Sequence, residues 1–345
     1  MIEYNYLLND IILVKTSNIV SLNLFLFIII AFLTSLVIDI IFGELPARVH
    51  PVVIIGSIIG FFKNLFIRFK SRLPGLMVVI AVCIVSSTIV YVIYRICSFN
   101  VVLWFVAFAI LVSSTFSIKM LLSTAVDVKD ALDESIDKAR EMVSYLVSRN
   151  TDELTESFIV SAVIESLTEN ITDSYVAPIF YYFIFALVIL KCPVNDPLYF
   201  LLMIPMLYRI SNTMDAMLGY KTDELINIGY VPAKIDDILN YIPSRISGLC
   251  VVISAYLLNL DGKNAYKVMM RDARNCPSPN SGYTMATTAG ALNIQLIKKE
   301  TYILGDDNKS ITGEDIQKAV DLSKMTILLF TIIIILLFII LYVIL

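Results

Sequence analysis

The chain has 345 residues, of which 58% are hydrophobic and only 16% are charged, and its formal net charge is −4. A soluble domain usually carries about a quarter charged residues, so this composition excludes an ordinary soluble protein. The small negative charge is spread over several loops and gives no reason to expect a nucleic-acid partner. One histidine and five scattered cysteines, with no C-x-x-C pair, exclude a zinc site and a disulfide framework.

Apolar runs long enough to span a membrane dominate the chain. Four of them have roughly 18 to 21 residues, which is enough to cross a hydrocarbon core of about 30 Å. Two shorter runs flank Cys192–Pro197 and form either two short spans or a re-entrant pair. The apolar segments are 22–42, 75–94, 101–118, 175–190, 198–208, 246–260 and 325–345. We predict an all-α, polytopic integral membrane protein with about five to seven hydrophobic helices in a single domain over residues 1–345.

The distribution of lysine and arginine predicts the orientation. The loop after the first span carries five basic residues between Arg48 and Arg72, which places it in the cytoplasm. Hairpins over 75–118 and 175–208 return the following loops to the same side. The basic segment 261–324 belongs there too, provided that 246–260, only about 22 Å long as a helix, dips in and returns or lies along the surface. We expect a multi-pass protein of the cell membrane with cytoplasmic helical loops.

Two polar stretches between the spans have helical character. Residues 119–150 contain good helix formers without Gly or Pro. A further helix is expected from Asp152 onward, capped by Thr151 or Asp152. Four polar loops, described next, carry the candidate site residues: 43–56, 161–174, 208–245 and 271–292.

The first loop, 43–56, follows Asp39 at the end of the first apolar run. Pro46 and Pro51 break the helix there, which leaves Asp39 and His50 at the membrane interface. These residues are candidates for substrate binding. A charged turn at the membrane edge explains them equally well.

The second loop, 161–174, is acidic within an apolar context. Read as a helix, it places Ser161, Glu165, Glu169 and Asp173 on one face at i, i+4 steps. Neighbouring carboxylates repel one another near lipid unless a cation, a proton donor or a polar substrate lies among them. The competing interpretation is a cytoplasmic helix that exposes its acids, but an apolar run follows at once. We expect a functional site at a membrane boundary, with Asn170 beside it.

The third loop, 208–245, is rich in acids, amides and arginines. An adjacent Asp pair with a nearby Asn suits Mg²⁺, which is normally held by one or two carboxylates and by substrate phosphates. Acids that stabilise a helix N-terminus are the alternative explanation. The two arginines are candidate anion partners. The candidate residues are Arg209, Asn212, Asp215, Asp236, Asp237, Asn240 and Arg245, with Asp236 and Asp237 as the metal ligands.

The fourth loop, 271–292, contains Ser-Pro-Asn-Ser-Gly at 278–282. This is turn chemistry, and it leads into a segment rich in Ala, Thr and Gly. A turn into a helix N-terminus can hold a phosphate or a carboxylate, which makes Ser278 and Asn280 candidates. It is equally consistent with a turn alone.

Several nucleotide and hydrolase motifs are missing. The sequence has no G-x-x-x-x-G-K-[ST] P-loop, no G-x-G-x-x-G after a strand, no G-x-S-x-G and no H-E-x-x-H. The residues alone therefore indicate a membrane protein with an acidic and amide-rich interfacial site that is assisted by a cation.

In combination, the clusters resemble the adenosylcobinamide-phosphate synthase family of cobalamin biosynthesis, known as CobD or CbiB. The resemblance covers about residues 35 to 315, and five motifs in order make it specific. These are Asp39, Gly43 and His50-Pro51-Val52; Glu165-Ser166, Glu169-Asn170, Asp173-Ser174, Ala177-Pro178 and Phe180-Tyr181-Tyr182; Tyr208-Arg209, Asn212-Thr213, Asp215, Met217 and Gly219-Tyr220-Lys221; Asp236-Asp237, Asn240-Tyr241-Ile242-Pro243 and Arg245; and Ser278-Pro279-Asn280, Gly282 and Ala289-Gly290-Ala291-Leu292.

The sequence departs from the family pattern at a few positions. Gly43-Glu44-Leu45-Pro46 stands where the family usually has Gly-Asp-Pro, Lys234 replaces an Arg, and Tyr283 replaces a frequent Trp. These changes keep charge or aromatic character. Lys298-Lys299 occupies the region of a usual Gly-Gly, which leaves the role of that loop open.

The resemblance implies an amide-forming ligase. It would join the free propionate of adenosylcobyric acid to (R)-1-aminopropan-2-ol or to its O-phosphate, and the choice between the two amines stays open. ATP and Mg²⁺ are the expected helpers, and other cobalamin-pathway enzymes are further candidate partners. Carboxylates would hold Mg²⁺ and deprotonate the amine: Glu165, Glu169, Asp173, Asp236 and Asp237. Arg209 and Arg245 would take phosphate, and Asn170, Asn212, Asn240 and Asn280 would bind the corrinoid.

Two other classes of function stay open at this point. Acids in membrane segments also mark the pathways of transporters, so a corrinoid transporter or binding protein without catalysis is the main alternative. A transporter should place polar residues near the bilayer midplane, whereas here they cluster in loops. A scaffold for later cobalamin enzymes is the third possibility.

Overall fold

The computed structural model describes residues 2–69, 71–147, 150–192 and 194–344, and most of these residues are helical. The elements are α1 (Ile2–Phe42), α2 (Pro51–Phe66), α3 (Leu73–Cys97), α4 (Val101–Ser113), α5 (Lys119–Glu134), α6 (Ile136–Ser144), α7 (Glu156–Ile171), the π-helix η1 (Thr172–Val176), α8 (Ala177–Lys191), α9 (Pro197–Leu218), α10 (Tyr230–Leu239), α11 (Tyr241–Leu257), α12 (Gly262–Asp272), α13 (Gly282–Leu292), β1 (Gln295–Lys298), β2 (Tyr302–Gly305) and α14 (Gly313–Ile344). The two strands pair as an antiparallel hairpin. The all-α prediction is confirmed.

Within the described residues, four helical stretches are long and apolar enough to cross a membrane: Ser21–Phe42, Leu73–Cys97, Glu156–Lys191 and Gly313–Ile344. A fifth is formed if α10 and α11, which meet at 48°, count as one broken span. Helices α2 and α4 are apolar but shorter. These lengths support the prediction of a multi-pass membrane protein.

Helix α1 illustrates how the membrane-facing and core-facing sides separate. Ile28 and Phe32 are buried against the other helices, whereas Ile30 and Leu33 are exposed on the outer side. Because all of these residues are apolar, their exposed side suits lipid rather than water. The neighbouring spans repeat the pattern, with buried and exposed apolar residues on opposite faces.

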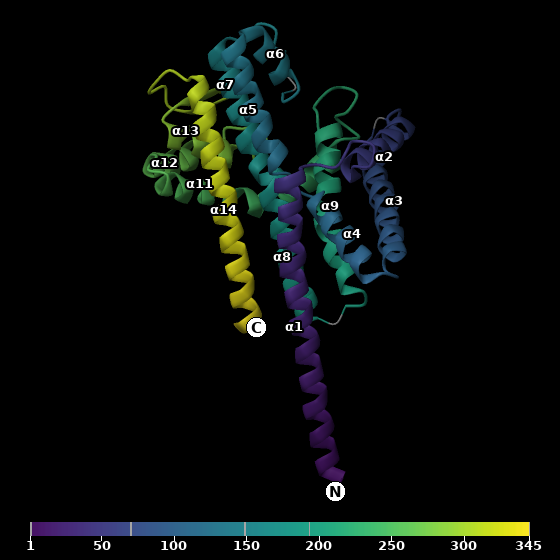
Figure 1. The fold of residues 1–345 in the computed structure, drawn as a ribbon. Coiled ribbons are helices and arrows are strands. Elements are labelled where there is room, and N and C mark those ends of the chain that lie inside the picture. The colour runs from purple at the N-terminus through teal and green to yellow at the C-terminus, as the bar shows by residue number, and fades with distance from the viewer. Residues whose placement is uncertain (1, 70, 148–149, 193, 345) are drawn as a thin grey trace.

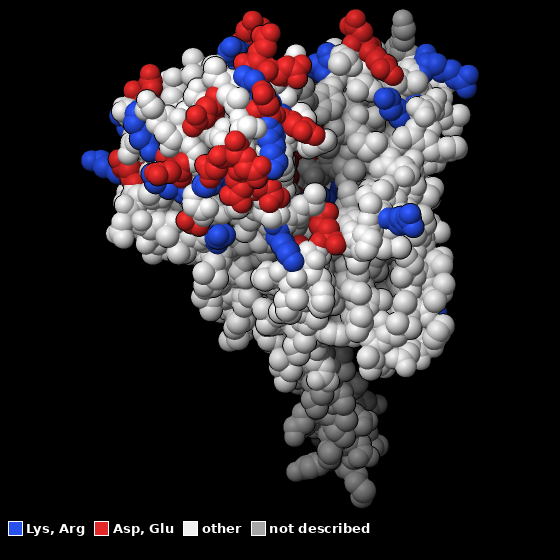
Figure 2. Space-filling model, turned by 45° about the horizontal axis from the view of Figure 1, so that its top comes forward, with Lys and Arg blue, Asp and Glu red and all other residues white. Residues whose placement is uncertain are grey.

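The polar elements gather at one end of the molecule. Figure 1 shows α5, α6, α12, α13 and the hairpin at the upper end, while both chain termini lie at the lower end. Figure 2 shows the Lys, Arg, Asp and Glu side chains over that same end, above an almost uncharged body. The sequence prediction that the polar loops share one side agrees with this arrangement.

A continuous helix from Glu156 to Lys191 connects the polar end to the membrane body, and it widens into a π-helix at Thr172–Val176. Pro178 has no backbone N–H and cannot donate to the carbonyl of Ser174, four residues earlier. That carbonyl accepts instead from the Ser117 backbone N–H at 2.9 Å. Such wide turns often occur at functional sites, and this one contains Asp173.

The structure corrects three local expectations. Helix α7 begins after Thr155, so the predicted cap at Thr151 or Asp152 is wrong. The polar helix of 119–150 is divided at Ser135, whose hydroxyl accepts from the Lys138 N–H and starts α6. The apolar run 101–118 is helical only to Ser113, because the chain turns there to pair with the π-helix.

Candidate functional site

Residues from three of the four predicted loops line one small polar cavity of about 80 Å³. Glu169, Thr172 and Asp173 come from α7 and η1, and Asp215 comes from the end of α9. The remaining lining residues are Asp236, Asn240 and Ser244 from α10 and the start of α11, and Ser278, Asn280 and Ser281 from the turn before α13. We call this the acidic cavity.

Glu169 and Asp173 occupy successive turns and face the acidic cavity, as the i, i+4 pattern predicted. Their carboxylates are close enough to repel each other and those of Asp215 and Asp236. Lys298 of the hairpin and Arg209 of α9 offset part of this repulsion. The cavity thus concentrates negative charge in a region that excludes much of the solvent, which favours a bound cation or a cationic amine.

The acids Glu165, Glu169 and Asp173 lie along one face of α7 and η1, and we call them the acid stripe. Glu165, the first of them, has a different environment from the other two. Its carboxylate accepts from the Ser161 hydroxyl at 2.6 Å and from the Tyr302 hydroxyl at 2.9 Å. Ser161 in turn accepts from the Ile297 N–H. Glu165 therefore fastens the hairpin to α7 and does not line the acidic cavity.

Asp236 is held by a short hydrogen-bonded series. The Asn240 amide donates to Asp236 Oδ2 at 3.0 Å, and the Tyr208 hydroxyl donates to Asn240 Oδ1 at 2.8 Å. Asn212 lies beside both Asp173 and Asp236, and its side-chain oxygen accepts from the Arg209 guanidinium at 3.3 Å. Side chains of α9 and of the junction between α10 and α11 thereby fix the carboxylates.

Asp237, the neighbour of Asp236 in α10, does not line the acidic cavity, because adjacent residues of a helix do not face the same direction. It pairs with Lys234 at 2.8 Å and lines a larger neighbouring pocket together with Asp236. Of the two acids that the sequence suggested as metal ligands, only Asp236 therefore lines the acidic cavity, whereas both line the larger pocket.

Arg245 ties the turn before α13 to α11. Its guanidinium donates to Asn280 Oδ1 at 2.7 Å and to the Pro279 carbonyl at 3.2 Å. It also stacks on the rings of Tyr241 and Tyr283, at 3.7 and 4.3 Å from their centroids. Because these contacts occupy much of the guanidinium fork, Arg245 positions the turn and is poorly placed to bind phosphate.

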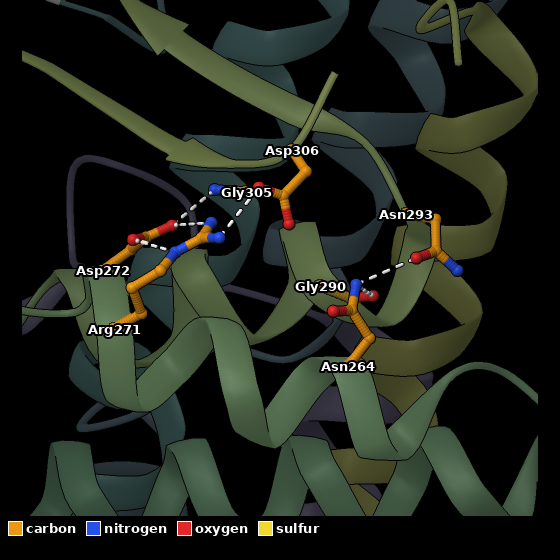
Figure 3. Close-up of polar contacts among 7 residues, drawn as sticks. All are labelled: Asn264, Arg271, Asp272, Gly290, Asn293, Gly305 and Asp306. Atoms are coloured by element: carbon orange, nitrogen blue, oxygen red, sulfur yellow. Dashed lines mark hydrogen bonds and ion pairs between the residues drawn. The ribbon is translucent and has the colours of Figure 1, made fainter. Parts of the chain in front are cut away.

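Helix α13 is held in place from its far end by α12. Asn264 donates to the Gly290 carbonyl and to Asn293 Oδ1, as Figure 3 shows. A Cβ on Gly290 would lie 2.7 Å from the Asn264 carbonyl oxygen, so only glycine permits this packing. The Ala-Gly-Ala-Leu motif therefore does not line the acidic cavity. It fixes α13, the helix that follows the Ser-Pro-Asn turn.

A second network in Figure 3 fixes the hairpin. Asp272 accepts twice from Arg271, each at 2.7 Å, and once from the Gly305 N–H at 2.9 Å. Burial alone would raise the pKa of Asp272, but these hydrogen bonds outweigh it, so the pKa is lowered. Arg271 also donates to Asp306 at 2.8 Å. The network holds the end of β2 against α12, and β1 carries Lys298 toward Glu169.

Asp215 stands where the acidic cavity meets the larger pocket and lines both. Burial and, to a lesser extent, the neighbouring Asp237 raise the pKa of Asp215 to about 6. A Cβ on Gly219 would lie 2.1 Å from Asp215 Oδ1. Glycine at 219 thus leaves room for the carboxylate.

The first predicted loop lies outside the acidic cavity. Asp39 Oδ2 accepts from the backbone N–H groups of Ile118 and Lys119, at 3.0 and 3.1 Å, and so holds the start of α5. His50 caps α2 by accepting from the Val52 N–H at 3.2 Å. Burial lowers the pKa of His50, and Glu44 opposes this shift. Both predicted substrate ligands have structural partners here.

Asn170 faces a third pocket, of about 200 Å³, on the other side of α7. Its amide donates to the Ser166 carbonyl. Arg209 lines the same pocket while its charge acts on Asp173. Arg209 therefore separates this pocket from the acidic cavity, and its Nε is buried with no hydrogen-bond partner among the described residues.

The chemistry of the donors allows a test for Mg²⁺. Asp236 Oδ1 is buried and lacks a hydrogen-bond partner among the described residues, as expected of an oxygen that awaits a cation. No group of three or more His, Cys, Asp or Glu side chains in the described part of the chain is arranged to hold a metal alone. The site thus fits an ion with one or two protein carboxylates and further oxygen from water or phosphate.

Some residues near the site were not predicted. Tyr302 and Lys298 reach the acid stripe from the hairpin, and Thr172, Ser244 and Ser281 line the acidic cavity. The serines lie next to predicted residues in their loops. The hairpin contacts have no sequence signal, because the hydrogen bond from Tyr302 to the acid stripe spans 137 residues of sequence.

A family model described as "CobD/Cbib protein" matches residues 32–329. The chain belongs to the CobD/CbiB family. The resemblance that the motifs indicated is thus confirmed, and with it a role in cobalamin biosynthesis.

Curated relatives cover most of the chain. A "Probable cobalamin biosynthesis protein CobD" of Methanothermobacter thermautotrophicus is 41% identical over 87% of this chain and 94% of its own length. A protein of the same description from Methanococcus aeolicus is 38% identical, over 81% and 87%. A "Cobalamin biosynthesis protein CobD" of Dehalococcoides mccartyi is 30% identical, over 84% and 90%. No solved structure matches the chain significantly.

Proposed function

We propose that this CobD/CbiB-family protein is an amide-forming ligase. It joins the free propionate of adenosylcobyric acid to the amine of (R)-1-aminopropan-2-ol or of its O-phosphate and produces adenosylcobinamide or its phosphate. The membership of the family supports the corrinoid as substrate. The basic residues of the polar loops support the cytoplasm as the compartment that the site faces.

The observation that carries the proposal is the convergence in the acidic cavity. Glu169 and Asp173 come from the second predicted loop and Asp215 and Asp236 from the third, and the amides of Asn240 and of Asn280, which lies in the fourth loop, join them. Repelling carboxylates are stabilised by a cation or an ammonium group. The amine substrate carries such a group, and Mg²⁺ is the other candidate.

Each group in the cavity has a chemical use in this reaction. A carboxylate of Glu169 or Asp173 accepts the proton that the ammonium group must lose before its nitrogen can attack. Asp236, with its free Oδ1, and Asp215 are suited to hold Mg²⁺. Bound Mg²⁺ and ATP would supply the activation of the carboxyl group that amide formation in water requires. Asn240 and Asn280 line the same cavity and offer amides to the amide-rimmed corrinoid.

The direct test is product formation. Purified protein is incubated with adenosylcobyric acid, ATP, Mg²⁺ and either amine, and the products are analysed by mass spectrometry. The proposal expects one new amide per corrinoid, and omission of ATP should abolish it. Corrinoid uptake into sealed vesicles without formation of the amide would instead identify a transporter.

A further inference from the structure

A pocket of about 630 Å³ opens beside the acidic cavity and shares Asp215, Asp236 and Ser278 with it. This is the volume range of pockets for small organic ligands. Its lining includes three cationic side chains, one from the residue before α3 and two from the connection after α9 and from α10: Arg72, Lys221 and Lys234. We call it the cationic pocket.

Close backbone packing brings these segments together. A Cβ on Gly75 would lie 2.4 Å from the Ile228 carbonyl oxygen, and one on Gly229 would lie 1.8 Å from that of Leu218. The segment between α9 and α10 therefore folds back onto α9 and against the first turn of α3. Arg72, the residue before α3, is carried to the pocket in this way.

The guanidinium of Arg72 is held over the ring of Tyr230, 3.7 Å from its centroid. This contact orients Arg72 and leaves the edge of the guanidinium available to donate hydrogen bonds. Lys221 is exposed. Lys234 pairs with Asp237 at 2.8 Å, so its charge is held on the wall of the pocket.

The same pocket is also lined by the carboxylates of Asp215, Asp236 and Asp237. Asp236 is more than nine-tenths buried, and its Oδ1 has no hydrogen-bond partner among the described residues. A pocket lined both by cations and by a carboxylate oxygen without a hydrogen-bond partner suits a phosphate that shares a divalent cation with the protein, because the cation bridges carboxylate and phosphate oxygens. The absence of a P-loop in the sequence is compatible with such a site, since side chains provide the positive charge.

We propose that the cationic pocket binds the phosphate group of a substrate through Arg72, Lys221 and Lys234, with Asp236 facing the accompanying divalent cation. The ligand is either a nucleoside triphosphate or the phosphate monoester of the amino alcohol, which present the same chemistry. The inference rests on the proposed ligase function and deepens it, because it places the phosphorylated substrate beside the acidic cavity.

The test measures binding without catalysis. The full-length protein in detergent is titrated, without corrinoid, with ATP and Mg²⁺ and separately with (R)-1-aminopropan-2-ol O-phosphate. Inorganic phosphate serves as competitor. The variants are Lys221→Gln and the triple variant Arg72→Gln, Lys221→Gln, Lys234→Gln. Arg95→Gln and Lys138→Gln, at exposed cations outside the pocket, are the matched controls.

We expect Lys221→Gln to weaken binding of at least one probe about tenfold and the triple variant to weaken it further, since each charge-assisted contact contributes that much. The controls should bind as the unmodified protein does. Loss of ATP binding alone assigns the pocket to the nucleotide, and loss of the other probe alone assigns it to the amino alcohol. Because Lys221 is exposed, its single variant keeps the test valid if the triple variant does not fold.

Two results would overturn the inference: no binding of either probe by the unmodified protein, or unchanged affinities in the triple variant. The proposed ligase function is scored separately by product formation. Amide formation with unchanged phosphate binding in the triple variant would refute the pocket and leave the ligase intact. Phosphate binding that depends on these cations, without any amide product, would do the reverse.

Discussion

The side-chain amide of Asn280 donates to the backbone carbonyl of Asp237 at 2.8 Å, across 43 residues of sequence. The oxygen of the same amide accepts from Arg245 at 2.7 Å. Asn280 is buried and thus connects the turn before α13 to the acid-bearing helix α10. The acidic cavity depends on this connection, because the third and fourth predicted loops, 208–245 and 271–292, meet at Asn280.

Replacement of Asn280 should weaken the whole cavity. Asn280→Ala leaves the Asp237 carbonyl and the Arg245 guanidinium without this partner, at a cost of about 1–3 kcal/mol. We expect a lower thermal unfolding midpoint in detergent and slower amide formation. Asn275→Ala, at an exposed position of the same segment, should change neither. Equal unfolding midpoints for the two variants would contradict this role.

Gly219 tests the placement of Asp215. In Gly219→Ala the new Cβ would lie 2.1 Å from Asp215 Oδ1 and 2.7 Å from the Asp215 carbonyl oxygen, so the carboxylate and the end of α9 must both shift. We expect a folded protein whose amide formation is slowed about tenfold or more, as a displacement of about 1 Å can cost even a hundredfold. Gly60→Ala is the matched control, because no atom lies within 4 Å of its added Cβ. Activity equal to that of the control would show that Asp215 need not stay in place.

The pKa of Asp215 predicts a pH dependence of stability. The ordinary pKa of an aspartate side chain is 3.8, and that of Asp215 is about 6 in the folded protein, where burial favours the neutral form. The folded state therefore binds the proton more tightly, and stability falls as pH rises from about 4 to about 6. Asp215→Asn removes this penalty. It should raise the unfolding midpoint at pH 8 and lose the advantage near pH 4, while Asp223→Asn, an exposed acid, changes little. A pH-independent difference would speak against the shift.

Much of the fold can be predicted from the composition and from the pattern of apolar residues along the chain. Spans such as 22–42 and 325–345 can be recognised in the sequence because a helix that crosses lipid must be continuous and apolar. The single side of the polar loops follows from the distribution of basic residues. Local breaks in the helices could not be predicted in this way. The helix break at Ser135 depends on one hydroxyl cap. The π-helix depends on Pro178 together with Ser117, which is remote in sequence.

Part of the candidate site could likewise be predicted from the sequence, and part could not. Glu169 and Asp173 could be placed together because they share a helix face, and family motifs pointed to Asp215, Asp236 and Asn280. The sequence could not show that Glu165 accepts a hydrogen bond from Tyr302 or that Asp39 holds the start of α5. Nor could it show that Arg245 stacks on two tyrosine rings. These roles depend on long-range contacts, which residue type and spacing alone do not specify.

The most direct test of the central claim is a double-mutant cycle on the rate of amide formation, measured with purified wild-type protein, Glu169→Gln, Asp236→Asn and the double variant. The two residues lie in different loops but line one cavity. We expect each single variant to lose at least about 100-fold and the double variant to lose clearly less than the product of both effects, because residues that act as a unit are not additive. A single variant that forms the amide at the wild-type rate, or losses that simply multiply, would contradict a shared site.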